Sequence, residues 1–412
     1  MPLANTPHGA TPVPPRATAG RERHGDAALA AFLDMLAHVT VEAPIFHSFP
    51  GALRADLLAP IWTWMARDIA GSVAARLGDA IASGAEPPAA FGAMLPEILD
   101  ALKANAEAER LDADRQRRNT IQMGGDGARA MLPRVIMAMR RRPLLEQAAK
   151  FGTAVGTLAD EAAIGTALQT ISIANPVTRA LWMQVMVDHI GNPSRMMAAV
   201  SALSGGAEEK TVLAAGYGPL VDAILSHAQS QIGLVASRPA LFGDIDGACK
   251  AIDRFHRLVR ALNYTLEIDR RSPWGRIIAD LTGRMSERLE RPLREVNANI
   301  TQALRRPRDN DRIDPDKILE GFNGLYLLMA VRASRDSLAV NALLDQAWTD
   351  TGRTLELLIA RALDAYRANP DDGVARERFD AGIKMAEIRF NAEYADILKR
   401  ARETAARRSA VS

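Results

Sequence analysis

Apolar side chains recur every three or four residues along most of this 412-residue chain, and this spacing constrains the fold more than any other feature. One series, Ile61, Met65, Ile69, continues in steps of four to Ile81. A period of 3.6 residues places such side chains on one helical face, whereas a half-buried strand alternates apolar and polar residues. The only candidate strand is the short run 39–41. We therefore expect an all-α protein of stacked helical hairpins, either a helical-repeat array or a multi-helix bundle, with no significant β-sheet.

The composition also favours helix over sheet. Aromatic residues make up only 5% of the chain, while alanine, leucine and arginine are abundant. These three residues are strong helix formers, and strands prefer the aromatic and β-branched residues. A chain of this length can bury a large core, as two or three domains or as one extended array.

A tryptophan is followed three times by aspartate six residues later and by glycine nine residues later. On a helix these offsets correspond to rotations of about 240° and 180°, so the three side chains cannot point into one pocket. We interpret the pattern as structural: tryptophan anchors one face, aspartate bonds to a neighbouring turn or an arginine, and glycine lets another helix approach closely. The three instances are Trp62-Asp68-Gly71, Trp182-Asp188-Gly191 and Trp274-Asp280-Gly283.

The last third of the chain shows a second self-similarity. Thr282-Gly283-Arg284 recurs as Thr351-Gly352-Arg353, and Trp274 and Trp348 lie 74 residues apart. A duplicated helical pair of about 70 residues would explain both matches. The alternative is chance, because helices rich in alanine, leucine and arginine resemble one another.

Local signals predict where several helices begin and end. A first strong helix should begin at Ala59-Pro60, and another at Asp314-Pro315, where aspartate caps the helix and proline occupies its first turn. The run Arg140–Pro143 predicts a helix end, with cations in the last turn before a helix-breaking residue. Pro292 should kink or end its helix. One last helix should cover residues 383–397.

Composition shifts divide the chain into five parts. The ends are rich in proline, arginine or polar residues and are expected to be disordered. Charged residues are sparse between Pro143 and Ala251, which suggests a largely buried centre. The predicted parts are a Pro/Arg-rich tail (1–26), an N-terminal helical region (27–142), a low-charge central region (143–243), a C-terminal region with internal duplication (244–400) and a basic tail (401–412).

The charge pattern argues against nucleic acid as a partner. The formal net charge is only +2, although the isoelectric point is about 8.8. Arginine outnumbers lysine by 44 to 7, a skew that codon usage in a GC-rich genome produces by itself. Phosphate-tracking proteins usually carry a larger surplus, clustered on one face.

Positive charge gathers locally between Arg110 and Arg142, where nine cations face three anions. Most clusters fall near predicted helix ends, where cations suit the helix dipole. The functional interpretation is a docking face for an acidic partner protein, with an anionic lipid surface or a second copy of the chain as further options. The candidate partner-binding residues are Arg140, Arg141, Arg142, Arg115, Arg117 and Arg118.

The low-charge centre suggests an alternative function. Its methionines and a tryptophan can enclose an apolar small molecule or lipid between helices, or simply form core. The candidate apolar pocket consists of Trp182, Met183, Met186, Met196 and Met197.

No spacing in the sequence points to a metal, a cofactor or a nucleophile. The histidines lack metal-ligand spacing, and Asp253-x-x-His256 is a single pair typical of a surface contact. Asp309-x-Asp311 resembles the start of a calcium loop but lacks its inner ligands and glycine. Cys249 is expected to be a core residue. We therefore expect a non-enzymatic adaptor or scaffold without a cofactor; a site assembled from distant residues would escape this reasoning.

Apolar run length, the N-terminal segment and the cysteine count bear on the location of the protein. No apolar run approaches the ~20 residues that span a bilayer, and the N-terminus has no hydrophobic signal core. A single cysteine suits a reducing compartment. We expect a cytoplasmic protein, with export through a route that reads no hydrophobic signal as the open alternative.

Overall fold

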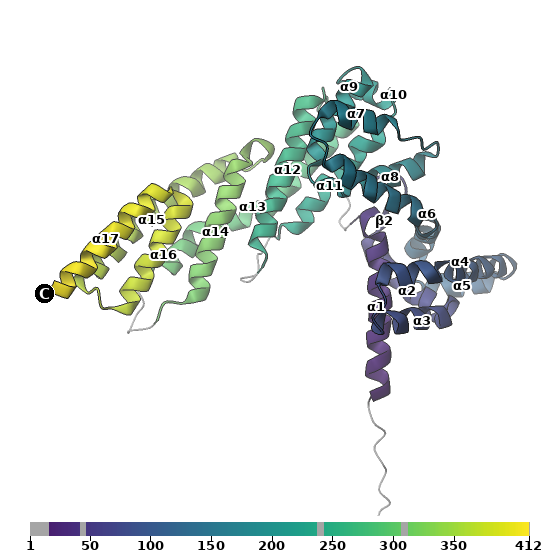
Figure 1. Cartoon of the computed structure of the whole chain (residues 1–412), viewed down its shortest axis with the longest axis horizontal. Helices are drawn as coiled ribbons and strands as arrows, with labels where there is room; N and C mark the ends of the chain where they lie inside the picture. The colour runs from purple at the N-terminus through teal and green to yellow at the C-terminus, as the bar shows by residue number, and fades with distance from the viewer. Residues whose placement is uncertain (1–15, 42–46, 237–242, 306–311, 412) are drawn as a thin grey trace, which may run out of the picture. The chain divides into compact units, whose positions relative to one another are not determined.

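The chain is all-α, as the sequence predicts (Figure 1). The computed structural model describes residues 16–41, 47–236, 243–305 and 312–411. Within these residues there are seventeen α-helices and one two-stranded parallel sheet, β1 (Thr40–Val41) with β2 (Leu53–Arg54). The only predicted strand segment is thus confirmed. The predicted tails fall partly on residues 1–15 and 412, which lie outside the described residues; residues 16–36 and 392–411 are helical.

The chain forms two compact units. Unit 1 comprises Met1–Ile45, Pro50–Phe151 and Ile173–Met186, and unit 2 comprises Phe46–Phe49, Gly152–Ser172 and Val187–Ser412. Each is described by itself below, and the domain ranges drawn from composition stay predictions.

Unit 1 is built on a small aromatic core. Helix α1 (Arg16–Leu36) packs against α2 (Ala55–Trp64), α3 (Gly71–Ala82) and α4 (Pro87–Leu111). The rings of Phe32 and Trp62 stack with centroids 4.9 Å apart, and Phe91 lies 5.7 Å from Trp62. Aromatic contacts of this kind add to the large apolar area that the rings bury. Helix α5 (Ala113–Gln122) packs on α4, and α6 (Asp126–Gly156) and α8 (Pro176–Asp188) contribute their unit 1 portions.

The predicted helix from Ala59-Pro60 is wrong in two respects. It begins earlier, at Ala55, so Pro60 lies inside α2, and a π-helical segment, η2 (Met65–Ile69), separates α2 from α3. Pro60 lacks the amide that would bond to the Asp56 carbonyl, so α2 loses one hydrogen bond there. Leu58, Ile61 and Trp62 around it are buried and hold the helix against the core. Helix α3 ends at Ala82, and Gly84 follows with a positive φ of 95°.

The predicted helix end at Arg140–Pro143 is also wrong. Helix α6 continues through Pro143 to Gly156. The proline costs the helix one hydrogen bond, but Met139 and Leu145 on either side of it are buried and hold both halves against the core. Pro292 lies buried within α13 (Pro273–Ala303) and does not end that helix, while the kink predicted there stays a prediction.

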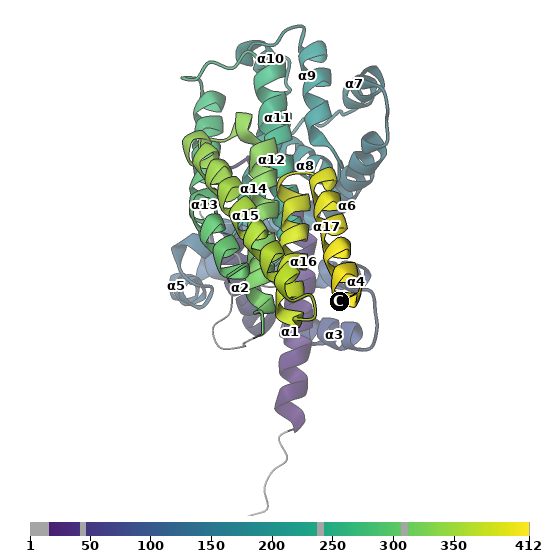
Figure 2. The same ribbon diagram turned by 90° about the vertical axis from the view of Figure 1, so that its left-hand side faces the viewer.

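Unit 2 contains a succession of stacked helices. Figure 2 shows its later helices side by side, and from α13 onward each packs against the next helix and the next but one. Such neighbours-only packing is what stacked hairpins require. The elements are α7 (Glu161–Gln169), η3 (Pro193–Arg195), α9 (Met196–Ser204), α10 (Glu209–Ala214), α11 (Gly218–Leu234), α12 (Ile245–Thr265), α13, α14 (Pro315–Ala333), η4 (Arg335–Ser337), α15 (Asn341–Ala368), α16 (Gly373–Arg389) and α17 (Ala392–Val411).

Capping residues set several helix starts in unit 2. The Asp314 carboxylate accepts a hydrogen bond of 3.0 Å from the Asp316 amide, which confirms the predicted start of α14. Asp372 caps α16 in the same way. The single helix predicted over 383–397 is instead α16 and α17, because the chain breaks at Phe390.

The structural interpretation of the tryptophan–aspartate–glycine pattern is only partly confirmed. The aspartates do form polar contacts: Asp68 with Arg67, Asp280 with Arg284 and Asp188 with His227. The explanation for the glycines is wrong, because a Cβ at Gly191 or Gly283 would meet no described atom within 4 Å. No neighbouring helix needs those glycines. The duplication of the C-terminal region stays a prediction.

We predict that Phe91→Ala lowers the free energy of unfolding by about 3–5 kcal/mol, because it removes a fully buried ring from the aromatic core. Urea denaturation followed by tryptophan fluorescence measures this. Leu111→Ala, also in α4 but 91% exposed, is the matched control and should change stability by less than about 0.5 kcal/mol. Equal effects would contradict the assignment of the core.

Candidate functional site

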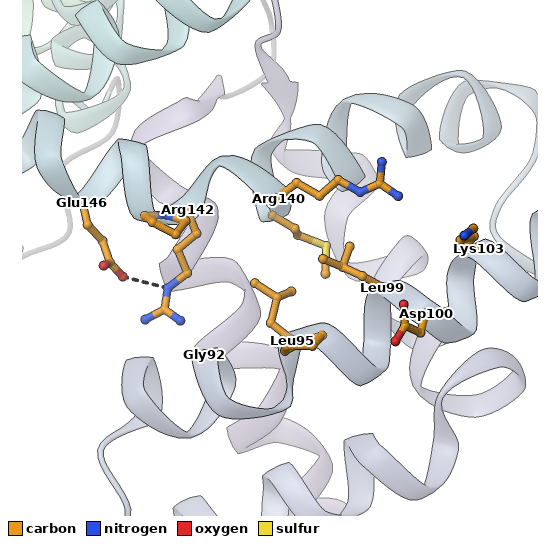
Figure 3. A pocket seen from close by; sticks show the side chains of 11 residues that line it. Gly92, Leu95, Leu99, Asp100, Lys103, Arg140, Arg142 and Glu146 are labelled. Carbon is orange, nitrogen blue, oxygen red and sulfur yellow. Dashed lines mark ion pairs between the residues drawn. The ribbon is translucent and has the colours of Figure 1, made fainter.

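An open groove of about 600 Å³ lies between α4 and α6 in unit 1 (Figure 3). Both helices present one face to it, because residues three or four apart lie on the same side of a helix. The lining residues are Gly92, Leu95, Pro96, Leu99, Asp100 and Lys103 from α4, and Met139, Arg140, Arg142, Pro143 and Glu146 from α6.

The floor of the groove is apolar. Leu95 and Met139 are buried, and Leu99 is half-buried beside them. In Figure 3 the Leu95 and Leu99 side chains lie between the two helices. Leu99 and the exposed Pro96 leave apolar surface open to solvent above this buried layer, and such surface favours burial by a second apolar surface.

Charged side chains form the rim. Lys103, Asp100 and Arg140 are exposed, as is Glu146. Within the described part of the chain, neither Arg140 nor Lys103 has a carboxylate within ion-pair distance. These two cations are therefore available to an outside anion, and we call them the rim cations.

Arg142 has a different role, because its interactions lie within the protein. Its Nε lies 2.9 Å from the Glu146 carboxylate, and its Nη2 donates a 2.7 Å hydrogen bond to the Pro88 carbonyl. Gly92 makes this possible, since a Cβ at that position would overlap the Arg142 guanidinium. Arg142 thus ties α6 to the beginning of α4 and forms one wall of the groove.

The remaining candidate arginines do not line the groove. Arg141 is exposed but points elsewhere on α6, as the 100° step between successive helical residues requires. The Arg115 guanidinium donates to Asn105 at 3.1 Å, and Arg118 lies 3.5 Å from Asp112. Arg117 is exposed on α5. The sequence cluster therefore divides, and only Arg140 and Arg142 contribute to the groove.

A buried polar network holds α5 and α6 against the far part of α4. Glu109, only 5% exposed, forms a 2.5 Å ion pair with Arg129 and accepts hydrogen bonds from Asn105 (2.9 Å) and Asn119 (2.6 Å). Burial alone raises the pKa of the Glu109 carboxyl, but the hydrogen bonds and the Arg129 charge outweigh burial and lower the pKa overall. The carboxylate is thus stabilised in its ionised form.

The candidate apolar pocket residues are all buried. Trp182, Met183 and Met186 belong to α8 in unit 1, where the Trp182 ring lies 5.1 Å from that of Phe151. Met196 and Met197 belong to α9 in unit 2. These five residues thus divide between the two units and pack as core within each, while a pocket that they share stays a prediction.

Other reactive side chains are placed in packed surroundings. Burial, reinforced by the charge of Asp246, raises the pKa of Cys249 to about 11, so the thiol stays protonated at neutral pH. Buried His256 pairs through Nδ1 with Ser337 Oγ at 2.9 Å, and Asp253 pairs with Arg257. The calcium-loop resemblance at 309–311 lies outside the described residues.

The described residues contain neither a metal-binding cluster nor a membrane-spanning helix. No group of three or more histidine, cysteine, aspartate or glutamate side chains is arranged to hold a metal ion there. Nor does any helix in the described ranges combine the length and the apolarity needed to cross a bilayer.

The groove residues that α4 contributes were not predicted from the sequence. Lys103 and Asp100 lie about forty residues before the arginines, and no local signal connects the two helices. The available signal was the spacing of Gly92, Leu95, Leu99 and Lys103, which places small, apolar and basic side chains along one helical face.

Comparison with protein-family models, with curated proteins and with solved structures finds no match for this chain.

We predict that Glu109→Ala lowers the free energy of unfolding by about 3–5 kcal/mol at pH 7, because it leaves Arg129 and two amides without their buried partner. Glu109→Gln should remove the part of the pH dependence of the free energy of unfolding that the Glu109 carboxyl causes. Because the folded pKa is lowered, its stabilising effect is present above the ordinary pKa of glutamate and is lost as pH falls through the folded pKa. Urea denaturation between pH 7 and pH 3 measures the stability of both variants. If the stability of the glutamine variant depends on pH as that of the wild type does, this account is contradicted.

Proposed function

We propose that this protein is a non-enzymatic adaptor or scaffold, and that the groove between α4 and α6 binds an acidic amphipathic helix of a partner protein. One observation carries the proposal: an apolar floor is bordered by the rim cations Arg140 and Lys103, neither of which has an ion-pair partner among the described residues. Helix-in-groove recognition uses such a combination, with apolar anchors in the groove and charges along its edge.

The surrounding charge supports an acidic partner. Arg141, next to the groove, and Arg117 on α5 are exposed, and the span from Arg110 to Arg142 has six more cations than anions. Such an excess steers an acidic surface towards the site and speeds association, more than it adds affinity. Binding should therefore weaken as ionic strength rises.

The concave shape favours a helix over a lipid surface. An apolar floor below a charged rim presents its contacts inward, where an inserted side chain reaches them. A flat anionic membrane would meet mainly the rim. Lipid binding is therefore an outcome that the experiment must distinguish.

We predict saturable binding of a fluorescein-labelled helical peptide with leucines at positions i, i+3, i+4 and i+7 and glutamates along both flanks. The double variant Arg140→Glu/Lys103→Glu should weaken binding by about tenfold or more, because both rim cations become repulsive. Fluorescence anisotropy at low and physiological ionic strength measures the affinity.

The matched control is Arg141→Glu, which reverses a neighbouring exposed charge that does not line the groove. It should retain most of the affinity. An equal loss in the control, or undiminished binding in the double variant, would exclude the groove as the docking site. Binding to phosphatidylserine vesicles that depends on Arg140 and Lys103, without peptide binding, would replace the proposal with a lipid-binding surface.

A further inference from the structure

A buried arginine in unit 2 lies against a tryptophan. Arg389, the last residue of α16, is only 6% exposed, and its guanidinium carbon lies 3.3 Å from the centroid of the Trp348 ring in α15. Its Nη2 donates a hydrogen bond of 2.5 Å to the Trp348 carbonyl, and its Nε lies 3.4 Å from Thr351 Oγ1. Arginine is rarely buried to this extent unless it has an anionic partner.

A second arginine contacts the same indole. The guanidinium carbon of Arg332, from α14, lies 3.6 Å from the Trp348 centroid. Two guanidinium groups this close to one centroid would overlap if they shared a face, so they lie on opposite faces of the ring. Cation–π attraction stabilises each of them, yet their like charges repel one another.

The pair has no direct acidic partner among the described residues. Within the described ranges neither Arg332 nor Arg389 has an acidic side chain at ion-pair distance. Burial first, and then the positive charge of Arg332, lower the pKa of Arg389 to about 10, while Glu356 acts in the opposite direction from farther away. Arg389 therefore remains charged at neutral pH, and two guanidinium groups are concentrated around one indole.

The fold holds this arrangement in place. A Cβ at Gly352 would come within 3.0 Å of Arg389 Nη2, so glycine leaves the room that the guanidinium occupies. Arg332 is exposed, and Arg389 Nη1 neither donates to a described residue nor belongs to the fully buried polar atoms. Arg332 thus presents its donors to solvent, and Arg389 keeps one guanidinium nitrogen without a hydrogen-bond partner among the described residues.

We propose that Arg332 and Arg389, positioned on the two faces of Trp348, bind a phosphate-type oxyanion. A dianion balances two positive charges, which a single carboxylate does not. The planar fork of a guanidinium matches the oxygens of a phosphoryl group. The cost of burying the Arg389 charge is already met in the folded protein, so an arriving anion gains the attraction without that cost. This site belongs to unit 2 and stands independently of the groove in unit 1.

The experiment follows the indole N–H signals of the full chain in two-dimensional ¹H–¹⁵N spectra, with the Trp348 signal assigned by Trp348→Phe. Inorganic phosphate should shift that signal saturably, while sodium chloride at equal ionic strength should not. Arg332→Gln should weaken phosphate binding by about tenfold or more, because it removes one of the two guanidinium groups. Since Arg332 is exposed, this variant is expected to fold.

Arg361→Gln is the matched control. Arg361 is an exposed arginine on the same helix, thirteen residues after Trp348, and the variant should bind phosphate as the wild type does. O-Phosphoserine is tested as a second ligand. If it binds more tightly than inorganic phosphate, the ligand of the site is a phosphorylated side chain. If it binds more weakly, the ligand is the free phosphate ion. An unsaturable shift, or the same shift in Arg332→Gln, would overturn the proposal.

Discussion

The contacts of the buried Glu109 carboxylate are the interactions on which the arrangement of α4, α5 and α6 depends. The carboxylate joins α4 to α5 through Asn119 and to α6 through Arg129. A buried charge is tolerated only when its partners are complete, so this network fixes how the helices meet. The groove lies farther along the same two helices, where Arg142 makes the second connection by bonding to Pro88. Two polar contacts between α4 and α6 thus frame an apolar surface that neither helix covers.

The two proposed sites use arginine in opposite ways. In the groove, the rim cations are exposed and surround an apolar floor, so they add steering and orientation to contacts that burial drives. Around Trp348, one guanidinium is buried and both contact an indole, so the charge itself is the attraction. An apolar floor with charges at its rim suits a helix, whereas two concentrated guanidinium groups suit a small oxyanion. We therefore propose different ligand classes for the two units.

Much of the fold follows from local sequence, whereas the sites do not. The all-α class follows from apolar spacing, and Asp314 marks a helix start because its side chain caps the adjacent amide. Pro143 misleads because burial of Met139 and Leu145 outweighs one lost hydrogen bond. Part of the predicted arginine cluster lies on α6, but its division between groove, wall and outer surface depends on α4. Arg389 gave no signal at all, since its partners come from two other helices, α14 and α15, that only the tertiary structure brings against α16.

Amide hydrogen exchange of the full chain, with and without a saturating acidic amphipathic peptide, tests the central claim most directly. If the groove receives a helix, protection should increase along the facing parts of α4 and α6, within 87–111 and 126–151, and the α14–α16 region should remain unchanged. Added protection confined to other helices, or spread evenly over the chain, would contradict the assignment of the groove as the docking site.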